Sequence, residues 1–160
     1  MLHRHLGSLS EPELAEVLAL RWDAAAPPGP RNLAELAKRL AGPDSLHRAL
    51  TGIDATALDL LIALVALGSG TSRTRLACFV GEPASVGTAE VERALAELRR
   101  RALAWPDAEG TLRLAPGLTD LLPVPLNLGS PARLLLPMLT VDQLSAIGRE
   151  LGTGAPRRKA

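Results

Sequence analysis

Aromatic residues are almost absent from this chain of 160 residues, which contains one phenylalanine, two tryptophans and no tyrosine. Proteins that bind single-stranded nucleic acid usually stack bases on several aromatic side chains, and cages for quaternary ammonium ligands are built from aromatic rings. The sequence therefore offers little material for either kind of site. Leucine and alanine, with 33 and 26 residues, supply most of the apolar content instead.

Cysteine and long apolar runs are also scarce. Cys78 is the only cysteine, so the chain cannot be a disulfide-bonded scaffold; its apolar neighbours predict a buried thiol with a structural role. The longest apolar stretch, Leu60–Leu67, is far shorter than the roughly 20 residues that span a bilayer. Met1–Leu9 lacks the apolar core of a signal peptide. We expect a cytoplasmic protein that makes no contact with a membrane.

The chain has no large excess of charge, since 18 lysines and arginines face 17 aspartates and glutamates for a net charge of +1. Proteins that bind nucleic acid without sequence preference are usually much more basic, because neutralising phosphate supplies their affinity. Sixteen of the basic residues are arginines, and together with abundant alanine, glycine and proline they are typical of a G+C-rich genome. Only a local patch of arginines could therefore indicate contact with DNA.

Sequence motifs for catalysis and for cofactors are missing. Neither a GxxxxGK[ST] phosphate loop nor a GxGxxG dinucleotide fingerprint occurs. His3 and His5 fall in a predicted flexible N-terminus and His47 is predicted to lie on the surface, so no set of metal ligands converges. The carboxylate pairs Glu90/Glu92 and Asp107/Glu109 lie among polar residues that would not raise a pKa. We expect no enzyme activity, no metal site and no cofactor.

What the sequence does contain is a series of capped helices, which predicts a mainly α-helical bundle. Ser10 and Glu13 form a capping box, and Asn32 caps the next long helix. Asp54 caps the helix Ala55–Leu67, whose circumference is apolar nearly all round, so we expect this helix to be buried at the centre.

The elements after the central helix follow the order of a winged helix-turn-helix domain. Arg73–Val80 is predicted as a short helix and Thr88–Leu103 as a longer one. Alternating residues in Leu103–Trp105 and Thr111–Leu114, on either side of a turn, then predict a β-hairpin that would form a small wing. The predicted fold class is therefore mainly α, a helical bundle with a winged helix-turn-helix domain.

The chain divides into five predicted parts along its length. These are a flexible N-terminus (1–8), an N-terminal helical subdomain (9–52), the winged helix-turn-helix (53–116), a proline-interrupted, leucine-rich segment with a C-terminal helix (117–151) and a basic tail (152–160). In the fourth part we expect a short helix from Ser130 to Leu136 and a last helix capped by Thr140 with Gln143. The stretch Leu118–Leu139 is a candidate docking surface for a partner; its packing against the chain's own core is the alternative.

Arginines in and beside the winged segment are the candidate nucleic-acid contacts. The six candidates are Arg73, Arg75, Arg93, Arg99, Arg100 and Arg113. Glu90 and Glu92, however, occupy the first turn of the recognition helix, where a DNA-reading helix usually presents hydrogen-bond donors. Glu97 and Arg101 are spaced to pair with each other. Two interpretations stay open, a solvated face of salt bridges and a weak, salt-dependent contact with double-stranded DNA.

Several segments together resemble one known family. They are the opening helix Leu9–Arg21, the proline linker Pro27–Pro30, the helix Asn32–Ala41, the stretch Arg48–Leu61 and the segments Ala94–Trp105 and Gly110–Pro116. This order is similar to the N-terminal, winged-helix-containing region of bacterial XPB-like superfamily-2 DNA helicases and their associated proteins. The ATPase motifs of the family's motor are absent from this chain.

The resemblance implies a non-catalytic accessory module that positions DNA or contacts the helicase motor domains or another protein partner. Two alternatives remain open. One is a stand-alone winged-helix transcription regulator that dimerises and reads a palindrome in DNA, and the other is a winged helix used purely for protein–protein interaction. The acidic first turn of the recognition helix favours the last of these.

Overall fold

The computed structural model describes residues 1–80, 88–123 and 135–152. The chain forms two compact units, Met1–Leu126 and Asn127–Ala160, and the predicted parts 9–52 and 53–116 both lie in the first. Its described residues are mainly helical, with one two-stranded antiparallel sheet, so the predicted mainly α class is confirmed. None of the helices in these ranges has the length and apolar character needed to cross a membrane.

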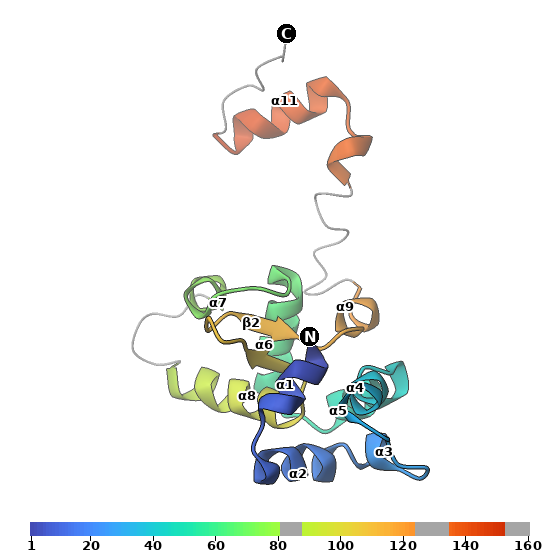
Figure 1. Cartoon of the computed structure of the whole chain (residues 1–160). Coiled ribbons are helices and arrows are strands. Elements are labelled where there is room, and N and C mark those ends of the chain that lie inside the picture. The colour runs from blue at the N-terminus through green and yellow to red at the C-terminus, as the bar shows by residue number, and fades with distance from the viewer. Residues whose placement is uncertain (81–87, 124–134, 153–160) are drawn as a thin grey trace. The chain divides into compact units, whose positions relative to one another are not determined.

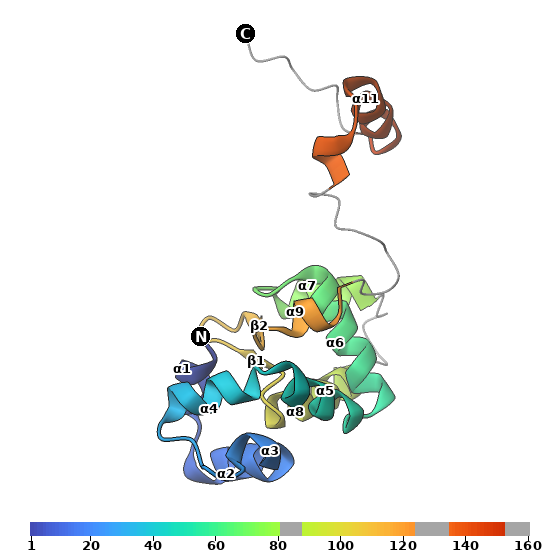
Figure 2. The ribbon, with the colours of Figure 1, turned by 90° about the vertical axis from the view of Figure 1, so that its right-hand side faces the viewer.

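Short helices make up the N-terminal part of the first unit (Figures 1 and 2). In chain order they are α1 (Leu2–Ser8), α2 (Glu11–Leu20), α3 (Trp22–Ala25), α4 (Leu33–Leu40) and α5 (Pro43–Thr51). The predicted capping box of α2 is present, because the Glu13 carboxylate accepts hydrogen bonds from the Ser10 N–H at 2.9 Å and the Ser10 hydroxyl at 2.8 Å. At α4, Asn32 Oδ1 accepts from the Glu35 N–H at 2.9 Å. Side-chain caps thus fix where both helices begin.

The prediction of a flexible N-terminus at residues 1–8 is wrong. These residues form α1, which packs against α4 (Figure 2). Leu2 and Leu6, one helical turn apart, are both buried, and the ring of His5 beside them stacks on Trp105 with centroids 4.7 Å apart and planes 7° from parallel. The sequence does not reveal this narrow buried face, because only two of its three residues are apolar and the third is His5.

The two tryptophans of the chain have opposite environments. Trp105 is only 4% exposed beneath His5, whereas Trp22 on α3 is 62% exposed. The guanidinium of Arg48 on α5 lies over the Trp22 ring, 5.7 Å from its centroid. This cation–π contact joins α3 to α5 at the surface.

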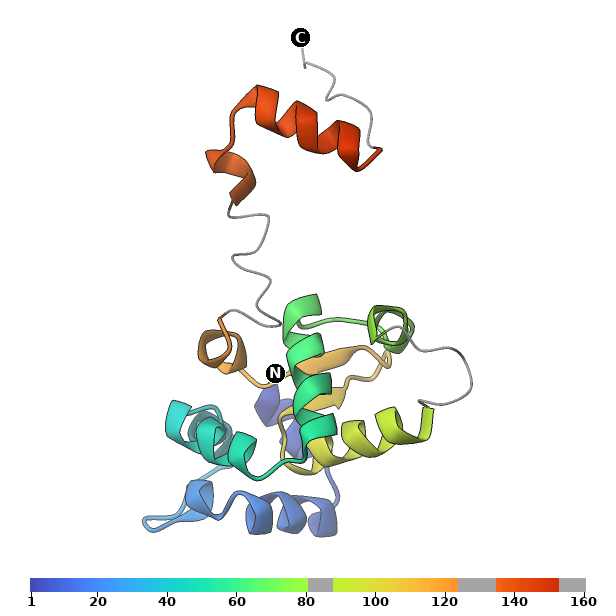
Figure 3. The same ribbon diagram turned by 180° about the vertical axis from the view of Figure 1, so that it is seen from behind.

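Three helices form the centre of the first unit, α6 (Ala55–Leu67), α7 (Arg73–Val80) and α8 (Thr88–Arg100). Figure 3 shows α6 crossing the unit with α7 and α8 beside it, and α6 contacts both. Asp54 caps α6 by accepting from the Ala57 N–H at 2.7 Å. Six residues of α6 are buried, among them Leu60, Leu61 and Leu64, so the prediction of a buried central helix is confirmed.

Helix α8 ends earlier than predicted, at Arg100 instead of Leu103. Ala102 adopts a left-handed conformation with φ of +52°, and the Leu103 N–H then bonds to the Leu98 carbonyl at 2.9 Å. This is the bond pattern of a Schellman ending, which usually has glycine at the left-handed position. Because alanine stands there, no glycine marks the end of the helix in the sequence.

The predicted β-hairpin follows α8 and is confirmed. Strands β1 (Ala104–Pro106) and β2 (Leu112–Leu114) pair antiparallel, with Trp105 opposite Arg113. Asp107 stabilises the turn by accepting from the Thr111 N–H at 2.8 Å and the Glu109 N–H at 3.1 Å. On the other edge of β2, Leu112 forms an isolated antiparallel bridge with Thr71 in the α6–α7 connection.

A buried arginine joins the N-terminal helices to the end of α8. Arg21, at the end of α2, is 0% exposed and donates to the Leu40 carbonyl at 2.7 Å, the Ser45 hydroxyl at 2.7 Å and the Arg101 carbonyl at 2.9 Å. Burial lowers the pKa of its guanidinium to about 10, opposed by nearby Asp23 and assisted by Arg101. Three separate chain segments thus share one cation.

Two further predictions from the sequence concern short stretches outside this core. The prediction that Cys78 is buried is wrong, because Cys78 is exposed. Among the α7 side chains that the structure describes, Leu76 alone is buried, and Phe79 is 43% exposed. A two-turn helix that buries one leucine leaves its neighbours in solvent whatever their hydrophobicity. His47 is exposed as predicted.

The C-terminal elements include α9 (Leu118–Leu121), which places Leu118 in the core of the first unit. The second unit contains the short helix η2 (Leu136–Met138) and α11 (Val141–Glu150), and the predicted capping box of Thr140 with Gln143 is confirmed. The predicted helix Ser130–Leu136 and the basic tail 152–160 lie mostly outside the described residues. So does the part of the candidate docking surface between residues 124 and 134.

Replacing the buried arginine tests its structural role. We expect Arg21→Ala to lower the free energy of unfolding by about 2–4 kcal/mol, because two buried carbonyls and a hydroxyl lose their donor and a cavity remains. Arg21→Lys should also destabilise, since one ammonium cannot reach acceptors on three segments. Urea denaturation followed by circular dichroism measures both. Lys38→Ala on the exposed side of α4 is the control, with a change within about 0.5 kcal/mol; an equally small effect of Arg21→Ala would contradict the role.

The stacked histidine predicts a pH dependence of stability. Burial, assisted by Arg99 and opposed by Glu13, lowers the pKa of His5 from 6.5 to about 4. Between these values the unfolded chain binds a proton that the folded chain does not, so stability falls as the pH falls. The loss should reach about 2 kcal/mol between pH 7.5 and pH 5.

Urea midpoints at the two pH values measure this loss, and His5→Phe, which keeps an aromatic ring on Trp105, should remove about 2 kcal/mol of the pH dependence. The matched control is His47→Phe at an exposed histidine, which should leave the pH dependence as in the wild type. Equal pH dependence in the wild type and His5→Phe would show that His5 is not the titrating group.

Candidate nucleic-acid interface

Four of the six arginines predicted to contact DNA are paired with carboxylates of the same unit. Arg73 on α7 bonds to Glu92 on α8. Arg113 on β2 bonds through Nε to Asp107 of the hairpin turn at 2.7 Å. Arg99 and Arg100, at the end of α8, both reach across to α2. The expected pairing of Glu97 with Arg101 is also present, at 2.7 Å.

The contacts between α8 and α2 form two parallel ion pairs. Arg99 Nη2 lies 2.7 Å from Glu13 Oε1, and Arg100 Nε lies 2.8 Å from Glu16 Oε1. Glu13 and Glu16 are three residues apart and therefore lie on one face of α2. Since all four side chains are about half exposed, these pairs contribute little to stability. Their main effect is to cancel the charge of two candidate DNA contacts.

Arg75 on α7 and Arg93 on α8 are the two remaining candidates. Both are exposed, and neither has an ion-pair partner among the residues that the structure describes. The Arg75 N–H donates a hydrogen bond to the Ser72 hydroxyl oxygen at 3.2 Å, which orders the first turn of α7. These two guanidiniums are therefore the candidates still available to a phosphate.

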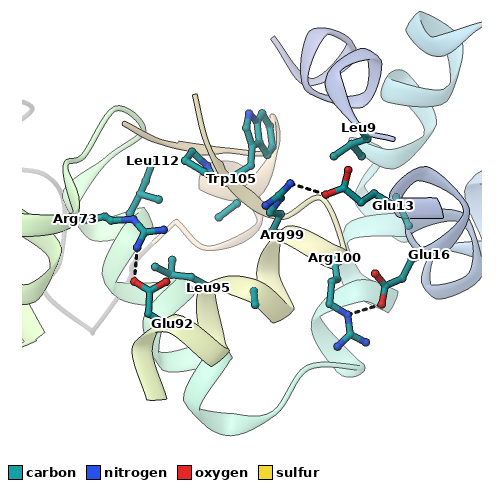
Figure 4. A pocket seen from close by; sticks show the side chains of 14 residues that line it. Leu9, Glu13, Glu16, Arg73, Glu92, Leu95, Arg99, Arg100, Trp105 and Leu112 are labelled. Carbon is teal, nitrogen blue, oxygen red and sulfur yellow. Dashed lines mark hydrogen bonds and ion pairs between the residues drawn. The ribbon is translucent and has the colours of Figure 1, made fainter. Parts of the chain in front are cut away.

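A groove of about 240 Å³ lies between α2, α8 and the hairpin (Figure 4). Its walls include the apolar side chains of Leu9, Leu95, Trp105 and Leu112. The three ion pairs of Arg73, Arg99 and Arg100 with their carboxylates stand around it, the first at one end and the other two at the opposite end. We call this feature the α2–α8 groove. Three of the six predicted arginines thus line the same groove, and each of them forms an ion pair with a carboxylate.

Two of the carboxylates that pair with the candidate arginines, Glu13 and Asp107, have a lowered pKa. Hydrogen bonds from the Ser10 N–H and hydroxyl lower the pKa of Glu13, and Arg99 lowers it further. For Asp107, partial desolvation acts to raise the pKa, but hydrogen bonds from Arg113 and the Thr111 N–H bring it below its ordinary value. The negative charges of Glu13 and Asp107 therefore persist throughout the neutral pH range.

The histidines and acidic residues of the described ranges, and the hollow beside His5, bear on whether the chain has a metal site. Within residues 1–80, 88–123 and 135–152, no group of three or more histidine, cysteine, aspartate or glutamate side chains could hold a metal ion. A second hollow, of about 610 Å³, lies between α1 and the hairpin turn and includes Arg4, His5 and Arg113 in its lining. His5 Nε2 is buried and has no hydrogen-bond partner among the residues that the structure describes.

Sequence reasoning missed the two acidic residues of α2 as parts of this region. Glu13 and Arg99 are separated by 86 positions in the chain, so no local pattern links them. Glu13 was identified only as a helix cap, which it also is. One signal in the sequence does point to them. Glu13 and Glu16 lie on the same face of the helix as the apolar residue Val17, and a helix face with an apolar residue is expected to contact another element.

Removing the α2 carboxylates should uncover the arginines that they neutralise. We expect Glu13→Gln with Glu16→Gln to strengthen binding to a random-sequence DNA duplex several-fold at low salt and to steepen its salt dependence, because Arg99 and Arg100 become free to meet phosphates. Fluorescence anisotropy with a labelled duplex measures both quantities.

The control for net charge is Glu11→Gln with Glu150→Gln. These two exposed carboxylates have no ion-pair partner in the described part of the chain, and their removal changes the total charge equally. A similar gain in the control pair would show that net charge, and not the release of Arg99 and Arg100, is responsible.

Comparisons with known proteins add no family to these observations. No protein-family model, no curated protein and no solved structure matches the chain. The contacts, charges and burial of its own residues are therefore what bears on its function.

Proposed function

We propose that the chain is a non-catalytic accessory module that acts through contacts with a protein partner and binds DNA only weakly. The observation that carries this proposal is the pairing of Arg73, Arg99, Arg100 and Arg113 with carboxylates of the same unit. A surface that reads DNA presents guanidiniums to phosphates and base edges. Here four of six such groups already have an anionic partner.

The order of elements in the first unit supports a winged-helix arrangement for this module. A central helix (α6), a single bridged residue (Thr71), two further helices (α7 and α8) and a hairpin (β1 and β2) follow one another. In winged helices a short strand between the first two helices pairs with the far strand of the wing. The isolated bridge from Thr71 to Leu112 is consistent with this arrangement and supports the proposal.

The acidic start of α8 supports protein contact over DNA reading. Glu90 and Glu92 are both exposed near the beginning of this helix, at the end that enters the major groove in helix-turn-helix complexes. Two carboxylates there would meet the phosphates of a duplex with like charge. An interface with a protein has no such uniform charge to avoid.

The similarity of the sequence to the N-terminal region of XPB-like DNA helicases suggests what such a partner is. In that setting the module would contact the helicase motor domains or a protein associated with them, while the motor supplies ATP hydrolysis. A stand-alone transcription regulator is the rival function, because it uses the same fold to read DNA directly.

A duplex titration distinguishes the module from the regulator. We expect a dissociation constant on the order of 10⁻⁴ to 10⁻⁶ M that weakens steeply with salt, as for non-specific binding. Arg75→Ala with Arg93→Ala should reduce this residual affinity more than Arg73→Ala with Arg113→Ala, because only the first two guanidiniums lack a described carboxylate partner.

The two double variants are each other's control, since both remove two positive charges. Tight, sequence-selective binding that survives 200 mM salt would contradict the accessory function and favour the regulator. Residual binding that depends on Arg73 and Arg113 instead would mean that their ion pairs open on DNA.

A further inference from the structure

We propose that the α2–α8 groove receives one apolar side chain of a partner protein, from a segment in which that side chain is flanked by an acidic and a basic residue. This inference deepens the proposed function and rests on it, because it names the surface and the chemistry of the partner. It follows from the size of the groove, from its apolar walls and from the arrangement of charges around it (Figure 4).

The size of the groove fits a side chain better than a cofactor. Its volume of about 240 Å³ lies below the roughly 300–1,000 Å³ of sites that enclose small-molecule ligands. Pockets that accept a single anchor residue are the usual centres of protein interfaces, with much of the binding energy in that residue. One large aliphatic or aromatic side chain matches this description.

The walls of the groove are apolar and fixed in place. Leu95, Trp105 and Leu112 are each less than 10% exposed and come from α8, β1 and β2, so three elements hold them. Leu9, which leads into α2, completes the apolar lining on the other side. An apolar side chain that enters here removes its own surface from water and needs no rearrangement of the walls.

The charges around the groove select a segment that carries both signs. Three guanidiniums and three carboxylates alternate there, with Arg73 and Glu92 at one end and the pairs from α2 and α8 at the other. A uniformly acidic ligand, nucleic acid included, meets three carboxylates as well as three arginines. A segment with one acid and one base beside the anchor can meet a complementary charge at each end.

The acidic side of the groove cannot withdraw to admit a polyanion. Helix α2, which carries Glu13 and Glu16, ends at Arg21, and this arginine is buried and bonded to three other segments. Val17 on the same helix is also buried. Since α2 is fixed at its core face, the carboxylates stay beside the arginines and the mixed charge is a permanent property of the surface.

Peptide selection tests the proposal. The probe is a phage-displayed library of random 12-residue peptides, selected against the whole chain, with affinities of the enriched peptides measured by fluorescence anisotropy. We expect an apolar residue with an acidic and a basic neighbour to be common to the enriched peptides. Ala96 is exposed and lines the groove. Ala96→Trp should therefore fill the groove and lower the affinity of these peptides about tenfold or more.

Matched variants separate filling of the groove from other effects. Ala89→Trp introduces the same ring at an exposed position of α8 that does not line the groove and should leave peptide affinity unchanged. Glu13→Gln with Arg99→Gln keeps two polar side chains in place but removes their charges. This double variant should weaken peptide binding several-fold and leave the circular dichroism spectrum unchanged. The equivalent change on α4, Glu35→Gln with Arg39→Gln, should have no effect.

The outcomes distinguish this inference from the proposed function. Enriched peptides that bind Ala96→Trp as tightly as the wild type overturn the groove as the site, while protein contact elsewhere on the chain still stands. Enriched peptides with acidic residues alone overturn the claim of mixed charge. Failure to enrich any peptide, together with tight and sequence-selective binding of duplex DNA, overturns both the inference and the proposed function.

Discussion

The buried guanidinium of Arg21 is the constraint on which the rest of the first unit depends. A cation without a carboxylate partner is costly to bury, and this one is tolerated because it donates to acceptors at the end of α4, in α5 and just after α8. The Leu40 and Arg101 carbonyls lie at the C-terminal ends of α4 and α8, where a carbonyl has no N–H donor from its own helix. One side chain thus satisfies the ends of two helices and places α2 against α8, which is what brings Glu13 and Glu16 to Arg99 and Arg100.

The ion pairs that follow from this placement shape the surface without stabilising it much. Each is about half exposed, and such pairs contribute between about 0 and 1 kcal/mol. They turn a local surplus of arginine into a surface of alternating charge. The near-neutral composition of the whole chain is reproduced at the scale of a single groove, so the partner that we propose would be selected by its pattern of charges and not by its net charge.

Local features of the structure could be predicted from the sequence, and distant ones could not. The caps at Ser10, Asn32 and Asp54 and the hairpin around Asp107 depend on residues within a few positions of one another, so their patterns are visible in the sequence. The pairing of Glu13 with Arg99 spans 86 positions and exists only because of the fold.

Two errors in the prediction have the same physical origin. Leu2 and Leu6 are too few to mark a helix in the sequence; the helix α1 that carries them packs against α4, and its His5 stacks on Trp105. Cys78, in contrast, has apolar neighbours in the sequence, Ala77 and Phe79, but is itself exposed on a helix that buries one leucine. Burial in such short helices is decided by the neighbouring elements, and the sequence of the helix alone does not contain that information.

The unequal surroundings of the two tryptophans give the protein a built-in optical reporter. An indole in solvent, as at Trp22, emits at longer wavelength than one enclosed by protein, as at Trp105, so the fluorescence spectrum contains two separable signals. Trp105 lies at the meeting point of α1, the hairpin and the α2–α8 groove, and Trp22 lies on the surface contact between α3 and α5. Since the chain has no tyrosine, its near-ultraviolet emission reports on these two places without a contribution from tyrosine.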